Sequence, residues 1–488
     1  MPTWLRLARI IAVLSIGLSF WVFAIRALSA YEASEIPPGV AVTSGCEEES
    51  LNTVWRAIHG GQTYSESTSV PYSAAYFNWL FYATYKLPVA AAVGRFGSII
   101  MPNTGRVITA VFALLGTAVL AWCLNRVMSG DLALSAGLAG TAFFGPLVGW
   151  WAITLRPDVG ALALETFALS IVLLGYRRTI PSIPLALGLF YAAWSFKQTY
   201  VMGLGGAVLF LVVRQCWRAA ATLALGAVGL WCLTLLALGT NYISAQLNTA
   251  TTNVYYLGAG LANLRGALER TAPLWLLAAP SLCWHSQIVA EPDSTLAADA
   301  RLLGFLGLLV SLPLAFAASC KIGAALNYYF TPSLFLAFLA ASALATRPAP
   351  RLATIAFLSA SALQLLLALG FTGSVSLASQ SRDLAQKWHA WREAPTPRFS
   401  ALNTLNLPWL NPGQPAFVLA YNYPLERAAG RAFERGGIGG LISDGYFASL
   451  LLPESTTRVY DGGALVRYSR GPAMQGYVIF YRTDSPEP

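Results

Sequence analysis

Long apolar runs separated by short polar segments dominate this chain up to residue 371. Many windows of 15 to 20 residues within these runs contain no charge, which is the pattern of helices that cross a membrane. The pattern predicts about eleven such helices, at residues 10–30, 106–125, 132–153, 158–175, 183–196, 199–213, 220–239, 272–286, 302–319, 329–346 and 352–371. We therefore expect an all-α, polytopic membrane domain over residues 1–371 and a separate region over residues 372–488.

The composition is that of a membrane protein. Of the 488 residues, 56% are hydrophobic and 11% are charged, whereas a soluble domain carries about 25% charged residues. The net charge of +9 does not indicate a nucleic-acid-binding surface, because the basic residues are scattered between the apolar runs and do not gather on one polar surface. We expect no nucleic-acid partner.

Basic residues at the ends of the predicted spans set the expected topology. They fall on one side of the membrane if every span crosses, at Arg6, Arg9, Arg126, Arg177, Arg178, Arg214, Arg218, Arg347 and Arg351. By the positive-inside rule, the amino terminus is then cytoplasmic and the carboxyl terminus lies outside. The first run also admits a cleaved signal peptide, but its length favours a retained helix, and cleavage would leave the remaining topology unchanged.

Two segments on the outer side are long. Residues 31–105 form the first outer loop, with amphipathic stretches at 46–64 and 71–89 that we expect to lie as helices along the outer leaflet. Residues 372–488 alternate strand-like and helix-like pieces, such as "LERAAGRAFERGG" and "GYVIFYRT". This alternation predicts a small extracytoplasmic α/β domain.

The fifth and sixth predicted spans are short. Residues 185–213 hold two crossings in under 30 residues, so each helix is only ~22 Å long against a hydrocarbon core of ~30 Å. The turn between them must then lie below the membrane surface, where irregular backbone is tolerated only if it lines a cavity or is buried in protein. This turn reads "SFKQTY", which predicts that Lys197 and Gln198 face a cavity.

Several outer-side charges are not explained by topology: Glu47, Glu48, Glu49, Arg156, Asp158, Lys197, Arg265, Arg270 and Lys321. Charges at the membrane edge are costly and tend to mark function. Asp158 has a second interpretation, as the residue that caps its helix and complements the helix dipole. Glu165 lies seven residues further on the same helix face, and we interpret it as a packing residue held by hydrogen bonds.

The order of these motifs resembles the GT-C superfamily of polytopic, lipid-sugar-dependent glycosyltransferases. The motifs are "EEES" after the first span, "YFNWLFY", "RPD", "FKQTY", "KIGAALNYYF" and an outer soluble tail. The chain is most similar to the bacterial branch that includes the protein mannosyltransferase and aminoarabinose transferase families, over residues 1–371. It departs from the usual Asp-Glu or Asp-Asp pair, because three glutamates and no aspartate stand at that position.

The resemblance implies transfer of a hexose or pentose from a polyprenyl-phosphate-linked donor, whose lipid tail lies in the bilayer, to an acceptor hydroxyl. The acceptor would be a protein, a lipid or a glycan at the outer face of the bacterial cytoplasmic membrane. A carboxylate would serve as general base on that hydroxyl. We favour Glu48, with Glu47 beside it, while the match among the three glutamates stays open. Asp158 would act in the same catalytic cavity.

The remaining expected site residues follow from the same resemblance. A leaving phosphate needs positive charge where its negative charge develops. The residues expected to bind phosphate are Arg156, Lys197, Gln198 and Lys321, and those expected to contact acceptor or sugar are Tyr64, Asn327 and Tyr328. No metal is demanded; any metal would be a hard ion, Mg²⁺ or Mn²⁺, held by Glu48 and Asp158. The alternative function is a transporter or flippase for a lipid or sugar, which would also use charges in a membrane cavity.

Overall fold

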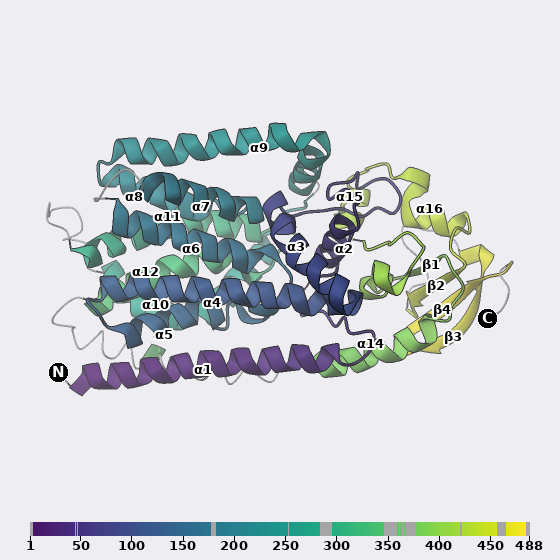
Figure 1. The fold of residues 1–488 in the computed structure, drawn as a ribbon, viewed down its shortest axis with the longest axis horizontal. Coiled ribbons are helices and arrows are strands. Elements are labelled where there is room, and N and C mark those ends of the chain that lie inside the picture. The colour runs from purple at the N-terminus through teal and green to yellow at the C-terminus, as the bar shows by residue number, and fades with distance from the viewer. Residues whose placement is uncertain are drawn as a thin grey trace.

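The computed structural model describes residues 3–43, 45, 47–176, 182–251, 253–283, 295–345, 377–419, 422–455 and 465–484, with a few isolated positions between 359 and 366. Its main body is a bundle of helices that run side by side in Figure 1. They are α1 (Thr3–Ser34), α4 (Met101–Val127), α5 (Leu132–Phe144), α6 (Pro157–Gly175), α7 (Ser182–Phe196), α8 (Met202–Val213), α9 (Trp217–Thr251), α10 (Leu257–Cys283), α11 (Leu296–Ser319) and α12 (Phe330–Ala345).

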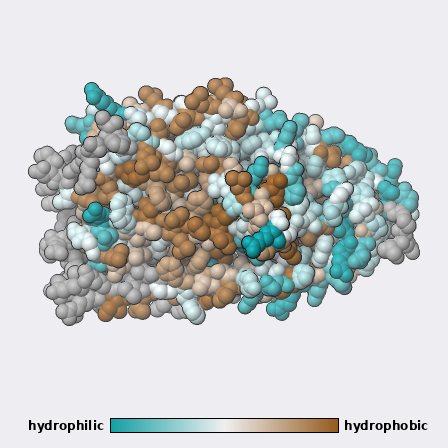
Figure 2. All heavy atoms as spheres, in the orientation of Figure 1, coloured by the Kyte–Doolittle hydropathy of each residue, from teal (hydrophilic) through white to brown (hydrophobic). Residues whose placement is uncertain are grey.

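The bundle has the apolar helices that a multi-pass membrane protein needs. Within the described ranges, five are long and apolar enough to cross a membrane: Ser98–Val127, Pro157–Gly175, Trp217–Leu247, Leu296–Ser319 and Leu326–Ala345. The helices α5, α7 and α8 are apolar but shorter. Figure 2 shows a hydrophobic surface over the bundle and a hydrophilic one over the opposite part of the molecule. Membrane helices are thus confirmed but their expected number is not, and the predicted span 352–371 lies almost wholly outside the described residues.

One predicted span is broken in the structure. Residues 132–153 form α5, which ends at Phe144, and then a separate 3-10 turn, Gly149–Ile153. Gly145 adopts an extended conformation (φ −69°, ψ 178°) directly before Pro146. A proline disfavours helical geometry in the residue before it and lacks the N–H that would continue the helix. The "GP" dipeptide therefore ends α5 within the apolar run.

Two other spans are longer than predicted. The expected span 220–239 is part of α9, which continues beyond a kink at Gly239 (φ 76°) as far as Thr251. The described part of the expected span 272–286, up to Cys283, belongs to α10, which begins at Leu257. Both extensions are more polar than the apolar runs that predicted the spans, and they bring additional side chains to the end of the bundle.

The first outer loop contains the two expected helices, α2 (Glu47–Ile58) and α3 (Trp79–Phe96), which lie between the bundle and the C-terminal part (Figure 1). The second helix starts eight residues later than the predicted stretch 71–89. Tyr72 has a positive φ of 61°, which a helix cannot accommodate. Its ring instead lies in the core of the C-terminal part, near Phe417, Tyr423 and Phe433.

The C-terminal part is a small α/β unit, as predicted. Its helices are α14 (Leu377–Trp391), α15 (Asn422–Ala428) and α16 (Gly437–Ser443). Its strands are β1 (Arg398–Ser400), β2 (Ser449–Pro453), β3 (Tyr468–Met474) and β4 (Tyr477–Arg482), in the order β1-β2-β4-β3. Strands β1 and β2 pair in parallel and the other pairs are antiparallel. The sheet and the amino terminus of α1 lie at opposite ends of the long axis (Figure 1).

Candidate active site

A cavity of about 260 Å³, lined by charged, polar and aromatic side chains, lies where the bundle meets the first outer loop. Its volume is just below the ~300–1,000 Å³ usual for small-molecule sites. It is lined by Glu49, Tyr76, Phe77, Trp151, Arg156, Lys197, Gln198, Thr199, Gln246, Tyr255, Ala318, Lys321, Gly323, Ala324, Ala325, Asn327 and Tyr328. Six of the ten residues predicted for the site line this cavity: Arg156, Lys197, Gln198, Lys321, Asn327 and Tyr328.

Three cations converge on the cavity from three different turns. Arg156 is the residue before Pro157 at the start of α6 and has the extended backbone that a following proline imposes (φ −147°, ψ 155°). Lys197 lies in the short turn between α7 and α8. Lys321 follows α11, where a bridge between its backbone and that of Tyr255 holds the segment in place. Burial lowers the pKa of Lys321 to about 8, and the charge of Lys197 adds to this effect.

Asp158 lies behind the cavity wall and holds two of these cations. Its carboxylate is fully buried. One oxygen accepts from Lys197 Nζ at 2.5 Å and from Asn327 Nδ2 at 2.6 Å, and the other accepts from Arg156 Nε at 3.3 Å. Asp158 lies in the first turn of α6 but does not cap it, because the N-cap position is Arg156. Its carboxylate instead fixes the positions of groups that line the cavity. Buried charges need such partners to offset the cost of desolvation.

Aromatic rings form much of the remaining wall. The guanidinium of Arg156 lies 4.2 Å from the ring centroid of Trp151 and 5.3 Å from that of Phe77. Lys197 Nζ lies 5.2 Å from the ring centroid of Tyr328. Cations in contact with ring faces are stabilised by the ring quadrupole. These contacts hold both cations at the cavity with few alternative conformations.

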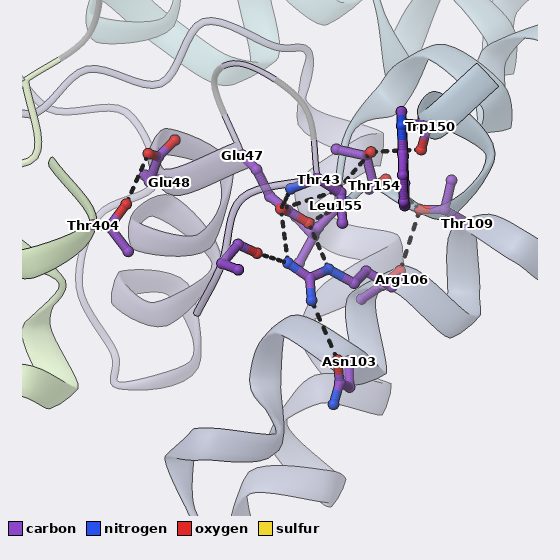
Figure 3. Close-up of polar contacts among 12 residues, drawn as sticks. Thr43, Glu47, Glu48, Asn103, Arg106, Thr109, Trp150, Thr154, Leu155 and Thr404 are labelled. Atoms are coloured by element: carbon purple, nitrogen blue, oxygen red, sulfur yellow. Dashed lines mark hydrogen bonds and ion pairs between the residues drawn. The ribbon is translucent and has the colours of Figure 1, made fainter. Parts of the chain in front are cut away.

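The three consecutive glutamates at the start of α2 point in three directions, because successive helical residues are about 100° apart. Glu47 points into the bundle, as Figure 3 shows. Its side chain is fully buried, and Arg106 donates to both of its oxygens, from Nε at 3.1 Å and from Nη2 at 3.0 Å. The backbone N–H groups of Leu155 and Thr43 donate at 3.1 and 3.0 Å. This carboxylate does not line the cavity.

Glu48 and Glu49 take the other two directions. Glu48 turns to the C-terminal part, where Thr404 Oγ1 donates to it at 3.0 Å (Figure 3). Burial raises the pKa of Glu48. Glu49 is buried, as Glu47 is, and it lines the cavity with the three cations. Of the lining residues in the described part of the chain, it is the only carboxylate.

Other lining residues offer hydrogen-bonding atoms. Gln198 donates from Nε2 to the backbone oxygen of Tyr76 at 3.1 Å, while its Oε1 has no partner among the residues that the structure describes. Within the described part of the chain, Asn327 Oδ1 and Gln246 Nε2 also have no partner. Tyr64, predicted to contact substrate, does not line the cavity; its hydroxyl donates to the backbone oxygen of Phe77 at 2.8 Å. Tyr64 therefore supports the cavity wall from behind.

Glu165 is a structural residue in a different part of the bundle. It is fully buried on α6, where it accepts from the backbone N–H of Gly203 at 2.8 Å and from Thr331 Oγ1 at 2.5 Å. These bonds join α6 to α8 and α12. This is the hydrogen-bonded packing role that the sequence predicted.

The residues at the cavity do not fit a divalent cation. The pair expected to hold one, Glu48 and Asp158, is divided: Glu48 faces the C-terminal part, and both oxygens of Asp158 accept from cations or an amide. No group of three or more His, Cys, Asp or Glu side chains occurs among the described residues. A hard metal ion needs several oxygen ligands, whereas the cavity offers one carboxylate beside three cations.

Some of the lining residues were not predicted from the sequence. Trp151 was placed within an unbroken span, although the "GP" at 145–146 is a signal that the helix ends before it. Gln246 lies on the part of α9 beyond the predicted span, where the apolar pattern gives no signal. Glu48 was favoured over Glu49 as the general base, because a run of three identical residues does not reveal which one faces a cavity.

Comparisons with known proteins address the fold. No family model matches the sequence, and no curated protein matches it significantly. Among solved structures, the chain is similar to ArnT from Cupriavidus metallidurans in the apo state, with a TM-score of 0.57 and 14% identity over 95% of this chain and 97% of that chain. The structure of that protein bound to undecaprenyl phosphate gives a TM-score of 0.57 and 14% identity over 96% and 98%.

An archaeal oligosaccharyltransferase, AglB from Archaeoglobus fulgidus, aligns more weakly, with a TM-score of 0.48 and 12% identity over 96% of this chain and 75% of that chain. The likeness to ArnT extends over both the helix bundle and the C-terminal part, since nearly all of each chain is covered. The chain therefore shares the fold of ArnT, the kind of fold that the sequence resemblance predicted.

Proposed function

We propose that this protein is a glycosyltransferase that moves a sugar from a polyprenyl-phosphate-linked donor to an acceptor hydroxyl. The observation that carries the proposal is one cavity that combines three cations, Arg156, Lys197 and Lys321, with a single carboxylate, Glu49. The cavity lies at the end of the bundle nearest the C-terminal part. In the predicted topology, this end faces the outer side of the bacterial cytoplasmic membrane, and the amino terminus is cytoplasmic.

The three cations suit a phosphate leaving group. When the bond between the anomeric carbon and the phosphate oxygen breaks, its electron pair goes to the phosphate. Fixed positive charge near that oxygen stabilises the transition state, because it needs no reorganisation as the charge develops. Asp158 and the aromatic rings hold Arg156 and Lys197 in place before the donor binds.

Glu49 is the carboxylate we assign as general base, in place of Glu48. The acceptor oxygen forms a bond to the anomeric carbon, and its proton passes to the Glu49 carboxylate. Glu48 is bonded to Thr404 and Glu47 to Arg106, so neither carboxylate reaches the cavity. General base catalysis contributes about 10²- to 10⁴-fold to a rate.

The size of the cavity limits what it binds. A volume of about 260 Å³ holds a phosphate and one sugar but not a polyprenyl chain. The lipid chain therefore lies along the apolar surface of the bundle, in the bilayer. The solved structure of ArnT with undecaprenyl phosphate supports this class of donor. We assign Gln198, Asn327 and Gln246 to the sugar hydroxyls, because each has an unpartnered polar atom.

Two measurements on the purified full-length protein in lipid nanodiscs test the proposal. The first is transfer of radiolabelled sugar from a set of polyprenyl-phosphate sugars to acceptors extracted from bacterial envelopes. The second is binding of undecaprenyl phosphate. Lys321→Met should weaken this binding about 10- to 100-fold, the value of one charge-assisted contact. Lys86→Met is the matched control, because Lys86 is exposed and does not line the cavity.

Equal affinity of the wild type and Lys321→Met for undecaprenyl phosphate would contradict the phosphate assignment. Failure of the wild type to transfer any of the sugars, together with movement of labelled lipid across liposome membranes, would show that the protein is a flippase. Transfer by the wild type with unchanged transfer by Glu49→Gln would leave the class of enzyme in place and remove the assigned base.

A further inference from the structure

A second cavity, of about 240 Å³, lies between the first outer loop, the outer part of α9 and the C-terminal part. Its lining consists of Ser65, Glu66, Ser67, Ala74, Tyr76, Thr240, Asn241, Ser244, Ala245 and Glu426. All of these are polar except the two alanines. A cavity with so many hydrogen-bonding side chains suits a ligand rich in hydroxyl or amine groups and excludes an apolar lipid chain.

Glu426, on α15, is the most informative residue of this cavity. Its side chain is only 1% exposed. One carboxylate oxygen, Oε2, accepts from Arg431 Nη1 at 3.0 Å and from Ser67 Oγ at 3.2 Å. The other oxygen, Oε1, is buried and has no hydrogen-bond partner among the described residues. An unsatisfied buried carboxylate oxygen is costly, and a hydroxyl or amine of a ligand in the cavity would satisfy it.

The charge of the cavity selects against anions. Among the lining residues in the described part of the chain there are two carboxylates, Glu66 and Glu426, and no lysine or arginine. Arg431 neutralises Glu426 through its ion pair, which leaves Glu66 without a cation in the lining. The first cavity, lined by three cations, has the opposite preference. The two cavities therefore select different chemical groups.

The two cavities are neighbours. Tyr76 lines both of them, and on α9 Ala245 lines the second while the next residue, Gln246, lines the first. The positive φ of Gly239 bends α9 just before Thr240 and Asn241, which brings these residues to the second cavity. A ligand held in the second cavity thus lies beside the place where the donor sugar would be.

We propose that this second cavity is an acceptor subsite that binds a neutral or amine-bearing saccharide unit, so that the acceptor is a glycan. The assignment of this cavity as an acceptor subsite rests on the proposed function. Saccharide binding to the cavity can be measured without sugar transfer. Glu426 Oε1 accepts a hydroxyl or amine hydrogen, Asn241 and Thr240 bond to further hydroxyls, and the Tyr76 ring packs on the sugar face. The adjacent reactive hydroxyl extends towards Glu49.

Saccharide binding to the full-length protein in nanodiscs tests the proposal. The probes are methyl glucoside, methyl glucosaminide, the anionic methyl glucuronide and a neutral serine-containing hexapeptide, followed by saturation-transfer NMR in saturating undecaprenyl phosphate. Methyl glucoside and methyl glucosaminide should each bind about tenfold more tightly than methyl glucuronide. Glu426→Gln should weaken their binding about tenfold, and Glu454→Gln, an exposed change in the same C-terminal part, should not.

Asn241→Ala is the second variant. Because the Asn241 side chain is exposed, removing it should leave the stability of the fold unchanged. It should weaken glycoside binding several-fold. Equal glycoside binding by the wild type and both variants would overturn the proposal, as would binding of the hexapeptide in preference to the glycosides. Glycoside binding that depends on Glu426, without transfer from any donor, would refute the proposed function and leave this subsite standing. Transfer without Glu426-dependent binding would refute the subsite alone.

Discussion

Isosteric changes at Glu47 and Glu49 should separate a structural carboxylate from a catalytic one. Glutamine replaces a carboxylate with an amide of nearly the same size, so each variant removes one charge and little volume. At Glu47 the amide cannot accept from every donor, because five hydrogen bonds from Thr43, Arg106 and Leu155 converge on the carboxylate. Arg106, only 5% exposed, would lose its counter-charge. Breaking a buried ion pair costs about 3–5 kcal/mol.

Glu47→Gln should therefore lower the unfolding temperature by several degrees, with little change in kcat for the fraction that stays folded. Glu49→Gln should do the reverse. It removes the proton acceptor from the cavity and should lower kcat by about 10²- to 10⁴-fold, while the unfolding temperature changes much less than in Glu47→Gln. Glu48→Gln, adjacent in sequence but outside the cavity, is the control for activity.

The assay combines two measurements on each purified variant: sugar transfer under saturating donor, and thermal unfolding followed by tryptophan fluorescence. A Glu48→Gln variant that loses the rate, beside a Glu49→Gln variant that keeps it, would show that the wrong carboxylate has been assigned. An unfolding temperature of Glu47→Gln equal to that of the wild type would show that the Arg106 network contributes nothing to stability.

Three further predictions concern single residues. Because burial lowers the pKa of Lys321 to about 8, its positive charge is lost as the pH rises through that value. The affinity for undecaprenyl phosphate should then fall above pH 8. In Lys321→Arg the affinity should no longer fall at alkaline pH. A wild-type affinity that does not change with pH would contradict the role of this charge. Asp158→Asn should release the two cations that it holds and lower both donor affinity and thermal stability, and rescue of affinity by Asp158→Glu would be the check. Gly203→Ala should destabilise the bundle by about 1–3 kcal/mol, because a Cβ there would lie 2.4 Å from Glu165 Oε1; denaturant titration measures the cost, and an unchanged midpoint would refute the packing argument.

The pattern of apolar runs predicted most of the bundle, because the length and composition of a run are what membrane crossing requires. The short pair at 185–213 predicted that the turn between its helices faces a cavity, and Lys197 and Gln198 do line one. "RPD" was informative for a similar reason: proline fixes the local backbone, so Arg156 and Asp158 have few alternative positions.

What the sequence could not resolve depends on distant partners. The directions of the three glutamates follow from the positions of Arg106 on α4 and Thr404 in the C-terminal part, neither of which a local pattern reveals. The second cavity could not be predicted for the same reason, because its lining comes from three regions that lie far apart in the sequence. The Tyr72 conformation that delays α3 likewise depends on packing against the C-terminal part.

The first turn of α2 also has a mechanical consequence. Glu47 joins the helix to the membrane bundle, Glu48 joins it to the C-terminal part, and Glu49 faces the cavity. A helix turns as one piece, so a displacement of the C-terminal part that pulled on Thr404 would roll α2 about its axis and swing Glu49 through the same angle.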